Sequence, residues 1–378
     1  MIVIKRALNN KINSKLFTGK AIIILGPRQS GKTTLIKNLS KNINKKQLIL
    51  NGDDPAVRQL LGNPTFSEIK QIVGNNRVII IDEAQRIENI GITIKMIIDE
   101  INDVQVIATG SSAFELNSKI NEPLTGRKWE YFLYPLSFSE MVNHTSYWEE
   151  SQKIDQRIIY GYYPDVVKSK GEQIEVLKLI SDSYLYKDIL ILDNIKKSNK
   201  IEKLLQALAL QLGHQVSYNE IAQLVELDKT TVEKYIHLLE QAYVIFRLPA
   251  LSRNIRNELK RTRKIYFYDN GLRNAIINNF NPLQLRQDVG SLWENFLISE
   301  RIKFNHYNGN YCNYFFWRTH AQQEIDFIEE RSGKLFAYEF KWNTRKKIKF
   351  PKAFEQAYQN SEFNVINKDN YSEFISQP

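Results

Sequence analysis

The sequence contains few of the residues that build disulfides and zinc sites. Among its 378 residues there are one cysteine, Cys312, and five histidines. One cysteine cannot form an internal disulfide, which is typical of proteins in a reducing compartment. The histidines also lack the spacing that is typical of a zinc site. We therefore expect a cytoplasmic protein whose chemistry uses neither zinc nor thiolate ligands.

Long hydrophobic runs are also missing from the sequence. The longest aliphatic runs, residues 21–25 and 78–81, are far shorter than the ~20 residues of a membrane-spanning helix. Residues 1–5 are four apolar residues and a lysine, without the longer apolar stretch of a secretory signal. With 43% hydrophobic and 25% charged residues, the composition is that of a folded globular protein. These features predict a folded chain without a membrane span.

The chain has a positive net charge. The sequence has 52 Lys plus Arg and 42 Asp plus Glu, which gives a net charge of +10. Half of this excess lies in residues 151–280, where 20 basic residues stand against 15 acidic ones. Residues 253–264 alone hold six basic residues and one acid. Such an excess indicates either a phosphate-bearing partner, a nucleotide or a nucleic acid, or simply a solvated surface.

The pattern of apolar residues predicts the α/β fold class. In the first 140 residues, short aliphatic strands alternate with amphipathic stretches, as in a parallel sheet covered by helices. The expected strands are residues 21–25, 47–50, 78–82, 104–108 and 129–134. Residues 174–211 have helical spacing, and an expected helix at 292–302 is followed by expected strands at 311–317, 324–329 and 335–342.

This pattern also predicts three domains. The first, residues 1–150, holds the parallel sheet. The second, residues 151–280, is expected to be helical and to contain a winged helix. The third, residues 281–378, is expected to be a small α+β domain. Each segment is long enough to bury a core of its own.

A phosphate-binding loop follows the first expected strand. Residues 26–33 read Gly-Pro-Arg-Gln-Ser-Gly-Lys-Thr, a pattern whose backbone N–H groups surround phosphate oxygens at the start of a helix. Lys32 would contact the β- and γ-phosphates of ATP, and the Thr33 hydroxyl would bind Mg²⁺. The predicted ATP-binding residues are Gly26, Pro27, Arg28, Gln29, Ser30, Gly31, Lys32, Thr33, Thr34 and, from a later strand, Ser111.

A second strand ends in two carboxylates, as a Walker B segment does. The apolar run 78–81 is followed directly by Asp82 and Glu83. Asp82 would hold Mg²⁺ through water, and Glu83 would act as the base that orients the attacking water. The two motifs are about 50 residues apart, and together they predict an ATPase site that uses ATP and Mg²⁺.

Two further polar features follow along the chain. The strand 104–108 ends in Thr-Gly-Ser-Ser, where a hydroxyl such as that of Ser111 could sense the γ-phosphate; a plain turn is the alternative. Arg127 could supply transition-state charge within its own chain or to a neighbouring subunit of a homo-oligomer. Equally, Arg127 could be a surface residue.

These motifs together resemble those of a known family. The segments GPRQSGKTT, VIIIDEAQ, ATGSS, LTGR and YPLSFSE resemble those of bacterial and archaeal AAA-type ATPases that carry a C-terminal domain of unknown function. The resemblance continues through residues 160–164 and 266–272 and covers essentially the whole chain. It implies an ATPase with an additional-strand, catalytic-glutamate sheet, and it implies no particular substrate.

The middle of the chain predicts a helix-turn-helix. Residues 217–243 contain two short expected helices, opened by capping boxes at Ser217-x-x-Glu220 and Thr230-x-x-Glu233. In a DNA-binding arrangement, the second helix and the basic segment after it, residues 229–264, would contact DNA or RNA. In the alternative, the segment packs on the nucleotide domain and transmits its state.

The last third contains charged residues in a characteristic order. Glu294 lies in an expected helix, Asp326 in a strand, and Glu339 and Lys341 in the next strand. This order resembles the PD-(D/E)-x-K nuclease superfamily. The resemblance implies that these four residues are catalytic and that Asp326 and Glu339 hold Mg²⁺. A solvated strand face, on which charged and apolar residues alternate, is the alternative.

Three functions therefore stay open at the level of the sequence. The first is a Mg²⁺-dependent ATPase, with Lys32, Glu83 and Arg127 as catalytic residues, that couples ATP to a nucleic-acid-directed C-terminal domain. The second is an ATP-switched DNA- or protein-binding protein whose nuclease-like domain does not cut. The third is a stress or signalling ATPase that never contacts nucleic acid. Residues 281–378 have 13 basic and 12 acidic residues, which is weak for a domain that must hold a polyanion alone.

Overall fold

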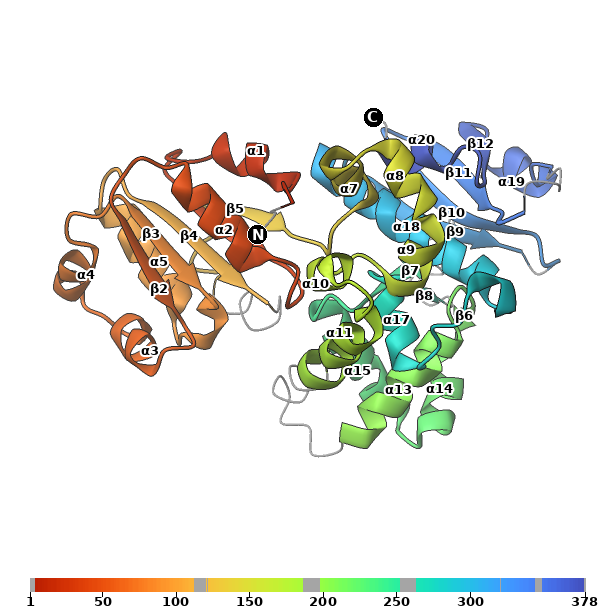
Figure 1. Cartoon of the computed structure of the whole chain (residues 1–378), viewed down its shortest axis with the longest axis horizontal. Coiled ribbons are helices and arrows are strands. Elements are labelled where there is room, and N and C mark those ends of the chain that lie inside the picture. Colours follow the sequence, from red (N-terminus) through yellow and green to blue (C-terminus); the bar gives the residue numbers. More distant parts are fainter. Residues whose placement is uncertain are drawn as a thin grey trace. The chain divides into compact units, whose positions relative to one another are not determined.

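The computed structural model describes residues 4–111, 120, 122–185, 198–251, 263–319, 321–343 and 349–376, which divide into two compact units (Figure 1). The first unit contains the described residues up to Pro135 together with Gln241–Tyr243, and the second contains the others. The three expected segments, 1–150, 151–280 and 281–378, do not coincide with these two compact units, and their division into domains stays a prediction. Residues 136–150 and the two later segments belong to one unit.

The first unit is built around a parallel sheet (Figure 1). Its described strands have the order β2-β3-β4-β1-β5, and each pairing between neighbours is parallel. Strand β4 lies between β1 and β3, which is the additional strand that the family resemblance implies. The strands are β1 (Ala21–Leu25), β2 (Gln47–Asn51), β3 (Val78–Asp82), β4 (Gln105–Gly110) and β5 (Lys128–Phe132). The α/β class is confirmed, and each of these strands lies within two residues of its expected bounds.

Isoleucines of the central strands form the core of this unit. Strand β1 is buried along its whole length, since β-branched residues suit a sheet that is covered on both faces. Ile23 of β1 and Ile81 of β3 pack in one cluster with Ile94 of α5. The helices of this unit are α1 (Leu8–Asn13), α2 (Lys32–Lys41), α3 (Pro55–Gly62), α4 (Phe66–Val73), the 3-10 turn η1 (Ala84–Arg86) and α5 (Ile90–Glu100).

The second unit begins with a group of helices. Helix α9 packs against α17, and α11 packs against both of them. The helices are α7 (Phe138–His144), α8 (Tyr147–Gln152), α9 (Ile154–Tyr160), α10 (Pro164–Lys168), α11 (Gln173–Leu179), the π-helix η2 (Ile180–Leu185) and α17 (Asn270–Ile276). The predicted helical stretch 174–211 corresponds to α11, η2 and the later helix α13, while residues 186–197 lie outside the described part of the chain.

The next elements have the order of a winged helix. Helix α13 (Ser198–Leu210), strand β6 (Gln215–Val216) and helices α14 (Tyr218–Val225) and α15 (Lys229–Gln241) come before strands β7 (Ile245–Pro249) and β8 (Arg263–Phe267). The three strands form an antiparallel sheet of order β6-β8-β7. The basic segment 253–262 that joins β7 to β8 lies outside the described residues.

The helix caps agree with the sequence at the first helix of this pair and differ at the second. Ser217 accepts the N–H of Glu220 at 3.5 Å, as expected. The second helix begins at Lys229, because the carboxylate of Asp228 accepts the N–H of Thr231 at 2.8 Å and also its hydroxyl. The predicted cap at Thr230 is therefore wrong, since an aspartate two residues earlier already satisfies the first turn.

A mixed sheet and a long helix complete the second unit. The sheet has the order β12-β11-β10-β9 among the described strands, and β12 is parallel to β11 while the other pairs are antiparallel. Figure 1 shows α18 running beside this sheet, and α18 contacts β11 and α20. The elements are η3 (Leu283–Leu285), α18 (Val289–Asn308), β9 (Asn313–Arg318), β10 (Glu324–Arg331), β11 (Lys334–Phe340), α19 (Lys352–Ala357), β12 (Ser361–Ile366) and α20 (Tyr371–Ser376). The expected helix and three strands are present, as is a helix at Gln356 after them (α19), whereas β12 and α20 were not predicted.

Buried polar side chains of α18 join the middle and C-terminal segments. The Asn295 side chain accepts the N–H of Phe267 at 2.7 Å and donates to its carbonyl at 3.0 Å. The carboxylate of Glu300 accepts the N–H of Phe138 at 2.7 Å. Because buried polar groups are costly when they are unpaired, these bonds tie the segments into one unit instead of two.

The two motifs at residues 160–164 and 266–272 pack directly on each other. The fully buried Asp269 caps α17 and also accepts the N–H of Tyr162 at 2.6 Å. A Cβ at Gly161 would lie 2.1 Å from Asp269 Oδ1, and a Cβ at Gly271 would lie 2.0 Å from the carbonyl oxygen of Tyr160. The glycines in these motifs are therefore required by close packing.

No helix in the described part of the chain is long and apolar enough to cross a bilayer.

Candidate functional site

The phosphate loop lies between β1 and α2, and its geometry requires both of its glycines. Gly26 has φ +156°, and a Cβ there would lie 2.2 Å from the carbonyl oxygen of Leu133. Gly31 has φ +97° and caps the N-terminus of α2. The predicted ATP-binding residues from Gly26 to Thr34 thus form a loop and the first turn of a helix, as an anion site requires.

Lys32 and Arg6 both bond to the carbonyl groups of this region. The Lys32 ammonium is buried and donates to the carbonyl oxygens of Gly26 and Pro27, each at 2.8 Å. Arg6, which is also buried, donates to the carbonyl oxygens of Ser30 at 2.6 Å and Tyr134 at 2.7 Å. Arg6 was not predicted, because a lone arginine about 20 residues before the loop gives no local signal. We assign it a positioning role for the loop.

The predicted magnesium residues are in contact. The Thr33 hydroxyl donates to Asp82 Oδ2 at 2.8 Å, and the Thr109 hydroxyl donates to Asp82 Oδ1. This follows from the topology, because β1, β3 and β4 are parallel and their carboxyl ends meet at one edge of the sheet. A hydroxyl and a carboxylate in contact fit the protein ligands of Mg²⁺ in a Mg–nucleotide complex.

Glu83 is held by a small hydrogen-bond network. Its backbone has φ +50°, and its N–H donates to Thr109 Oγ1 at 3.2 Å. The buried Gln85 amide donates to Glu83 Oε2 at 2.5 Å and to Ser111 Oγ at 2.8 Å. The predicted Ser111 therefore lies in the network of Glu83. Gln85 is a residue that the sequence reasoning missed, although its motif, VIIIDEAQ, was recognised.

Arg127 lies at the wrong end of the sheet to act on the phosphates of its own chain. Its carbonyl accepts the N–H of Ala21 at the start of β1, whereas the phosphate loop follows Leu25 at the other end. At roughly 3.3 Å per strand residue, these ends are ~13 Å apart. The guanidinium pairs with Asp99 at 2.7 Å on the surface. The prediction of a catalytic role within its own chain is therefore wrong, whereas the predicted role toward a neighbouring subunit stays a prediction.

A second polar site lies in the second unit, where the structure brings together the four predicted nuclease-like residues. Glu294 lies on α18, Asp326 on β10, and Glu339 on β11, directly before Phe340 and Lys341. Lys341 pairs with Glu339 at 2.7 Å, and Asp326 accepts the N–H of Phe340 at 2.8 Å. The pairing of β10 with β9 shifts in register between Ile325 and Ile328, an irregularity that re-aims side chains such as that of Asp326.

The sequence reasoning missed two members of this site, Lys264 and Glu324. Lys264 had been counted with the basic segment 253–264 as a contact for phosphates. Its side chain is instead 2% exposed, and its ammonium lies 3.1 Å from Glu294 Oε1 and 2.6 Å from Glu324 Oε1. Tyr266, two residues later on β8, donates to Glu294 at 2.5 Å. Lys264 is thus unavailable to a nucleic acid, because its buried ammonium is paired with the carboxylates of Glu294 and Glu324.

Two acids of this site are hard to ionise. Burial, reinforced by the charge of Glu294, raises the pKa of Asp326 to about 7, although Lys264 and the N–H of Phe340 oppose the shift. Burial, reinforced by Asp326, raises the pKa of Glu339 to about 7 against the opposing effect of Lys341. Two interacting carboxyls that titrate near neutrality form a coupled pair.

The donor arrangement at this second site does not fit a divalent metal ion. No group of three or more Asp, Glu, His or Cys side chains is arranged to hold a metal in the described part of the chain. The carboxylates of the site already have nitrogen partners: Glu324 pairs with Lys264, Glu339 pairs with Lys341, and Asp326 accepts the N–H of Phe340. The predicted Mg²⁺ ligation by Asp326 and Glu339 is therefore not supported by this arrangement, because fixed cations already supply the positive charge.

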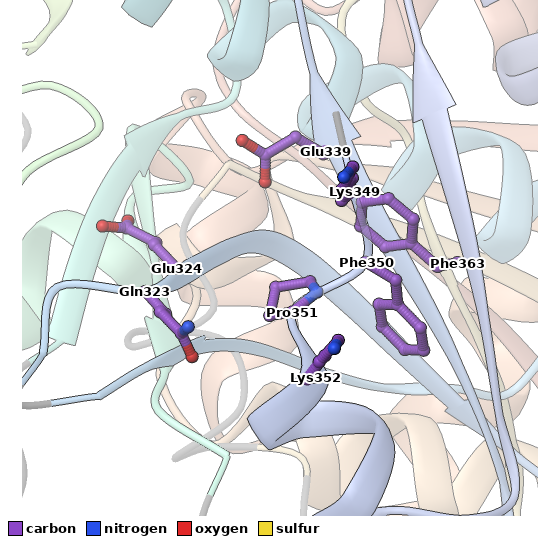
Figure 2. Close-up of a pocket in the computed structure, with 8 residues that line it drawn as sticks. All are labelled: Gln323, Glu324, Glu339, Lys349, Phe350, Pro351, Lys352 and Phe363. Carbon is purple, nitrogen blue, oxygen red and sulfur yellow. The ribbon is translucent and has the colours of Figure 1, made fainter. Parts of the chain in front are cut away.

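A pocket of about 390 Å³ opens beside this site. Figure 2 shows the carboxylates of Glu324 and Glu339 on one side of it and the rings of Phe350 and Phe363 on the other. The two rings are stacked, with their centroids 4.8 Å apart. The pocket-lining residues are Gln323, Glu324, Glu339, Lys349, Phe350, Pro351, Lys352 and Phe363.

The raised pKa of Asp326 predicts a pH-dependent effect of its replacement. A carboxyl whose pKa rises from 3.8 to about 7 on folding favours the protonated folded state, so its contribution to stability falls as pH rises from about 4 to 7. We expect Asp326→Asn to increase the free energy of unfolding relative to the wild type at about pH 8 and to have little effect at about pH 4. Urea denaturation at both pH values measures this difference. An equal change at both values would contradict it.

The fold and the first site define the class of this protein's first unit. A parallel sheet of order β2-β3-β4-β1-β5, a phosphate loop after β1, and an Asp-Glu pair after β3 are the features of a P-loop ATPase domain. Residues 18–142 match the family model of the AAA domain. Residues 151–283 and 289–375 match models described as domains of unknown function, DUF8612 and DUF4143.

The relatives that the chain resembles are distant. An uncharacterized protein of Mycobacterium bovis is 24% identical over 346 residues, which cover 90% of this chain and 74% of the relative. An uncharacterized protein of Methanocaldococcus jannaschii is 23% identical over 388 residues, which cover 96% of this chain and 84% of the relative. Among solved structures, the Walker-type ATPase of Pyrococcus abyssi is similar at 12% identity and a TM-score of 0.46, over 73% of this chain and 96% of that one.

Proposed function

We propose that this chain is a Mg²⁺-dependent ATPase whose nucleotide state controls nucleic-acid binding by the second unit. The observation that carries the ATPase proposal is the 2.8 Å hydrogen bond between Thr33 and Asp82, beside Glu83 and the phosphate loop. Thr33 and Asp82 would be the protein partners of Mg²⁺, which as a Lewis acid stabilises charge on the phosphate oxygens.

Other residues of the first unit have separate proposed roles in ATP hydrolysis. The loop N–H groups and the N-terminus of α2 bind the phosphates. The ammonium of Lys32 exchanges its partners Gly26 and Pro27 for phosphate oxygens and neutralises charge during phosphoryl transfer. Glu83 orients the water and accepts its proton, while Gln85 keeps the carboxylate in place.

Helix α15 is the proposed nucleic-acid contact. A helix-turn-helix presents the start of its second helix to a groove, and Lys229 and Thr230 are exposed at the start of α15. Residues 151–280 also carry half of the positive net charge, whereas residues 281–378 are nearly neutral. We therefore expect the middle of the chain to supply most of the affinity for a polyanion.

Metal-dependent nucleic-acid cleavage by the second unit is a second candidate function. One observation favours it: Glu294, Asp326, Glu339 and Lys341 lie together, and Glu339 lines an open pocket. The paired state of these carboxylates argues against it, because a metal-dependent nuclease needs carboxylates that coordinate the ion. We therefore favour binding without cleavage.

Binding of labelled single-stranded DNA, duplex DNA and RNA, followed by fluorescence anisotropy with and without ATP and Mg²⁺, tests this function. We expect ATP to change the affinity of the wild type and to leave the affinity of Lys32→Ala unchanged, and we expect binding to weaken steeply with salt. Lys229→Glu should weaken binding, whereas Lys168→Glu, an equal change of charge at an exposed residue of α10, should not. Failure to bind any of these probes would contradict the nucleic-acid proposal. Cleavage that Lys341→Ala abolishes would favour the second candidate.

A further inference from the structure

Lys264 is buried in an unusual environment for a lysine. Its side chain is 2% exposed, and its ammonium lies within 3.1 Å of two carboxylates, those of Glu294 and Glu324. It also lies 5.5 Å from the centre of the Phe316 ring. Burial opposes a charged ammonium, but the charges of Glu294, Asp326 and Glu324 outweigh it and raise the pKa of Lys264 above its ordinary value. The ammonium is therefore stabilised in its charged form inside the fold by the two carboxylates that it contacts.

The position of this charge joins two sheets. The backbone of Lys264 pairs with Gln215 of β6 and Leu248 of β7. Its side chain reaches the carboxylates of α18 and β10, beside the mixed sheet of β9–β12. The lysine thus delivers a positive charge from the winged-helix segment to the acidic cluster, which we define as Glu294, Glu324 and Asp326.

A divalent cation would have to bind at this same point. Mg²⁺ and Mn²⁺ are held by oxygen ligands, commonly one or two carboxylates together with water. The carboxylates of Glu294 and Glu324 already converge on one atom, Nζ of Lys264. An ammonium supplies positive charge at that atom but offers no open coordination position for water or phosphate.

We propose that Lys264 is the built-in cation of the acidic cluster, so that this site of the second unit works without a divalent metal. Replacing the ammonium by a neutral side chain then uncovers a divalent-cation site between the carboxylates of Glu294 and Glu324, completed by water. This proposal concerns metal binding alone, and it holds or fails independently of whether the second unit binds nucleic acid.

Binding of Mn²⁺ to the full chain, measured by electron paramagnetic resonance without nucleotide, tests the proposal. All proteins carry Asp82→Asn, so that Mn²⁺ does not bind at the nucleotide site. We expect the parent and its Lys264→Arg variant to leave Mn²⁺ free, and we expect Lys264→Met to bind one Mn²⁺. Adding Glu294→Gln to Lys264→Met should weaken that binding by at least roughly 10–100-fold, the range for loss of a group that only supports a metal ligand.

Thermal unfolding of the same proteins gives a second readout. Lys264→Met should have a lower midpoint than the parent, because its acidic cluster lacks a counter-charge. Mn²⁺ should raise the midpoint of Lys264→Met and leave that of the parent unchanged, because a ligand stabilises the state that binds it. Should Lys264→Met not fold, Lys264→Gln, which keeps a hydrogen-bond donor, replaces it in both measurements.

Two results would overturn the proposal. One is stoichiometric Mn²⁺ binding by the parent that Glu294→Gln abolishes, because the cluster would then accept a metal beside Lys264. The other is a folded Lys264→Met or Lys264→Gln protein that neither binds Mn²⁺ nor gains stability from it, because the lysine would then be an ordinary buried ion-pair partner.

Discussion

Lys32→Ala should lower the ATP turnover number by about 10²–10³-fold, the range for removal of one donor that stabilises the transition state. The ammonium is buried against the carbonyls of Gly26 and Pro27, at the loop that binds the phosphates. Glu83→Gln should lower turnover by roughly 10²–10⁴-fold, the range for loss of a general base. The two variants should differ in binding, because in the proposed mechanism Lys32 contacts the nucleotide whereas Glu83 contacts the attacking water.

Phosphate release and binding of a fluorescent ATP analogue separate these two roles. Lys32→Ala should lose both ATP affinity and turnover, whereas Glu83→Gln should keep its affinity. Lys37→Ala, which removes an exposed lysine from the same helix α2, is the matched control and should behave as the wild type. Turnover that survives Lys32→Ala would rule out the phosphate loop as the site of hydrolysis.

Gly271→Ala should destabilise the second unit by about 3 kcal/mol or more, at the upper end of the range for overpacking. A Cβ at this position would lie 2.0 Å from the carbonyl oxygen of Tyr160 and 3.0 Å from Asp269 Oδ1. The backbone of Tyr160 cannot move away cheaply, because Asp269 also holds the N–H of the nearby Tyr162. The added methyl group therefore separates two segments that are far apart in the sequence.

Urea denaturation followed by circular dichroism measures this loss. Gly290→Ala is the matched control, because Gly290 lies in α18 and a Cβ there would meet no atom within 4 Å. That variant should be neutral or up to about 1 kcal/mol more stable, since alanine favours a helix more than glycine does. Similar stabilities for the two variants would contradict the packing argument at Gly271.

Local pattern was sufficient for the first unit and its nucleotide site. Strand β1 is an aliphatic run, the loop after it is eight consecutive residues, and Asp82 directly follows β3. Each of these features depends on near neighbours along the chain, because strand burial follows residue type and a phosphate loop needs glycines at fixed spacing. The contact between Thr33 and Asp82 then follows from the parallel order of the strands.

Long-range partners could not be derived in this way. Only the sheet register shows that Arg127 lies at the start of β1, away from the phosphate loop of its own chain, and that it pairs with Asp99. Arg6 reaches the loop through bonds to residues 24 and 128 positions away. Such contacts leave no periodic signal, because they depend on where distant segments meet.

The sequence by itself determined the α/β class, the phosphate loop, the Asp-Glu pair and the order of charged residues in the last third. Tertiary structure alone decided that the middle and C-terminal segments form one unit and that Lys264 lies among acids. In the sequence Lys264 is one of six basic residues within the twelve-residue segment 253–264. Its burial sets it apart, because a charge enclosed by Glu294 and Glu324 must be neutralised within the fold and is no longer available to a partner.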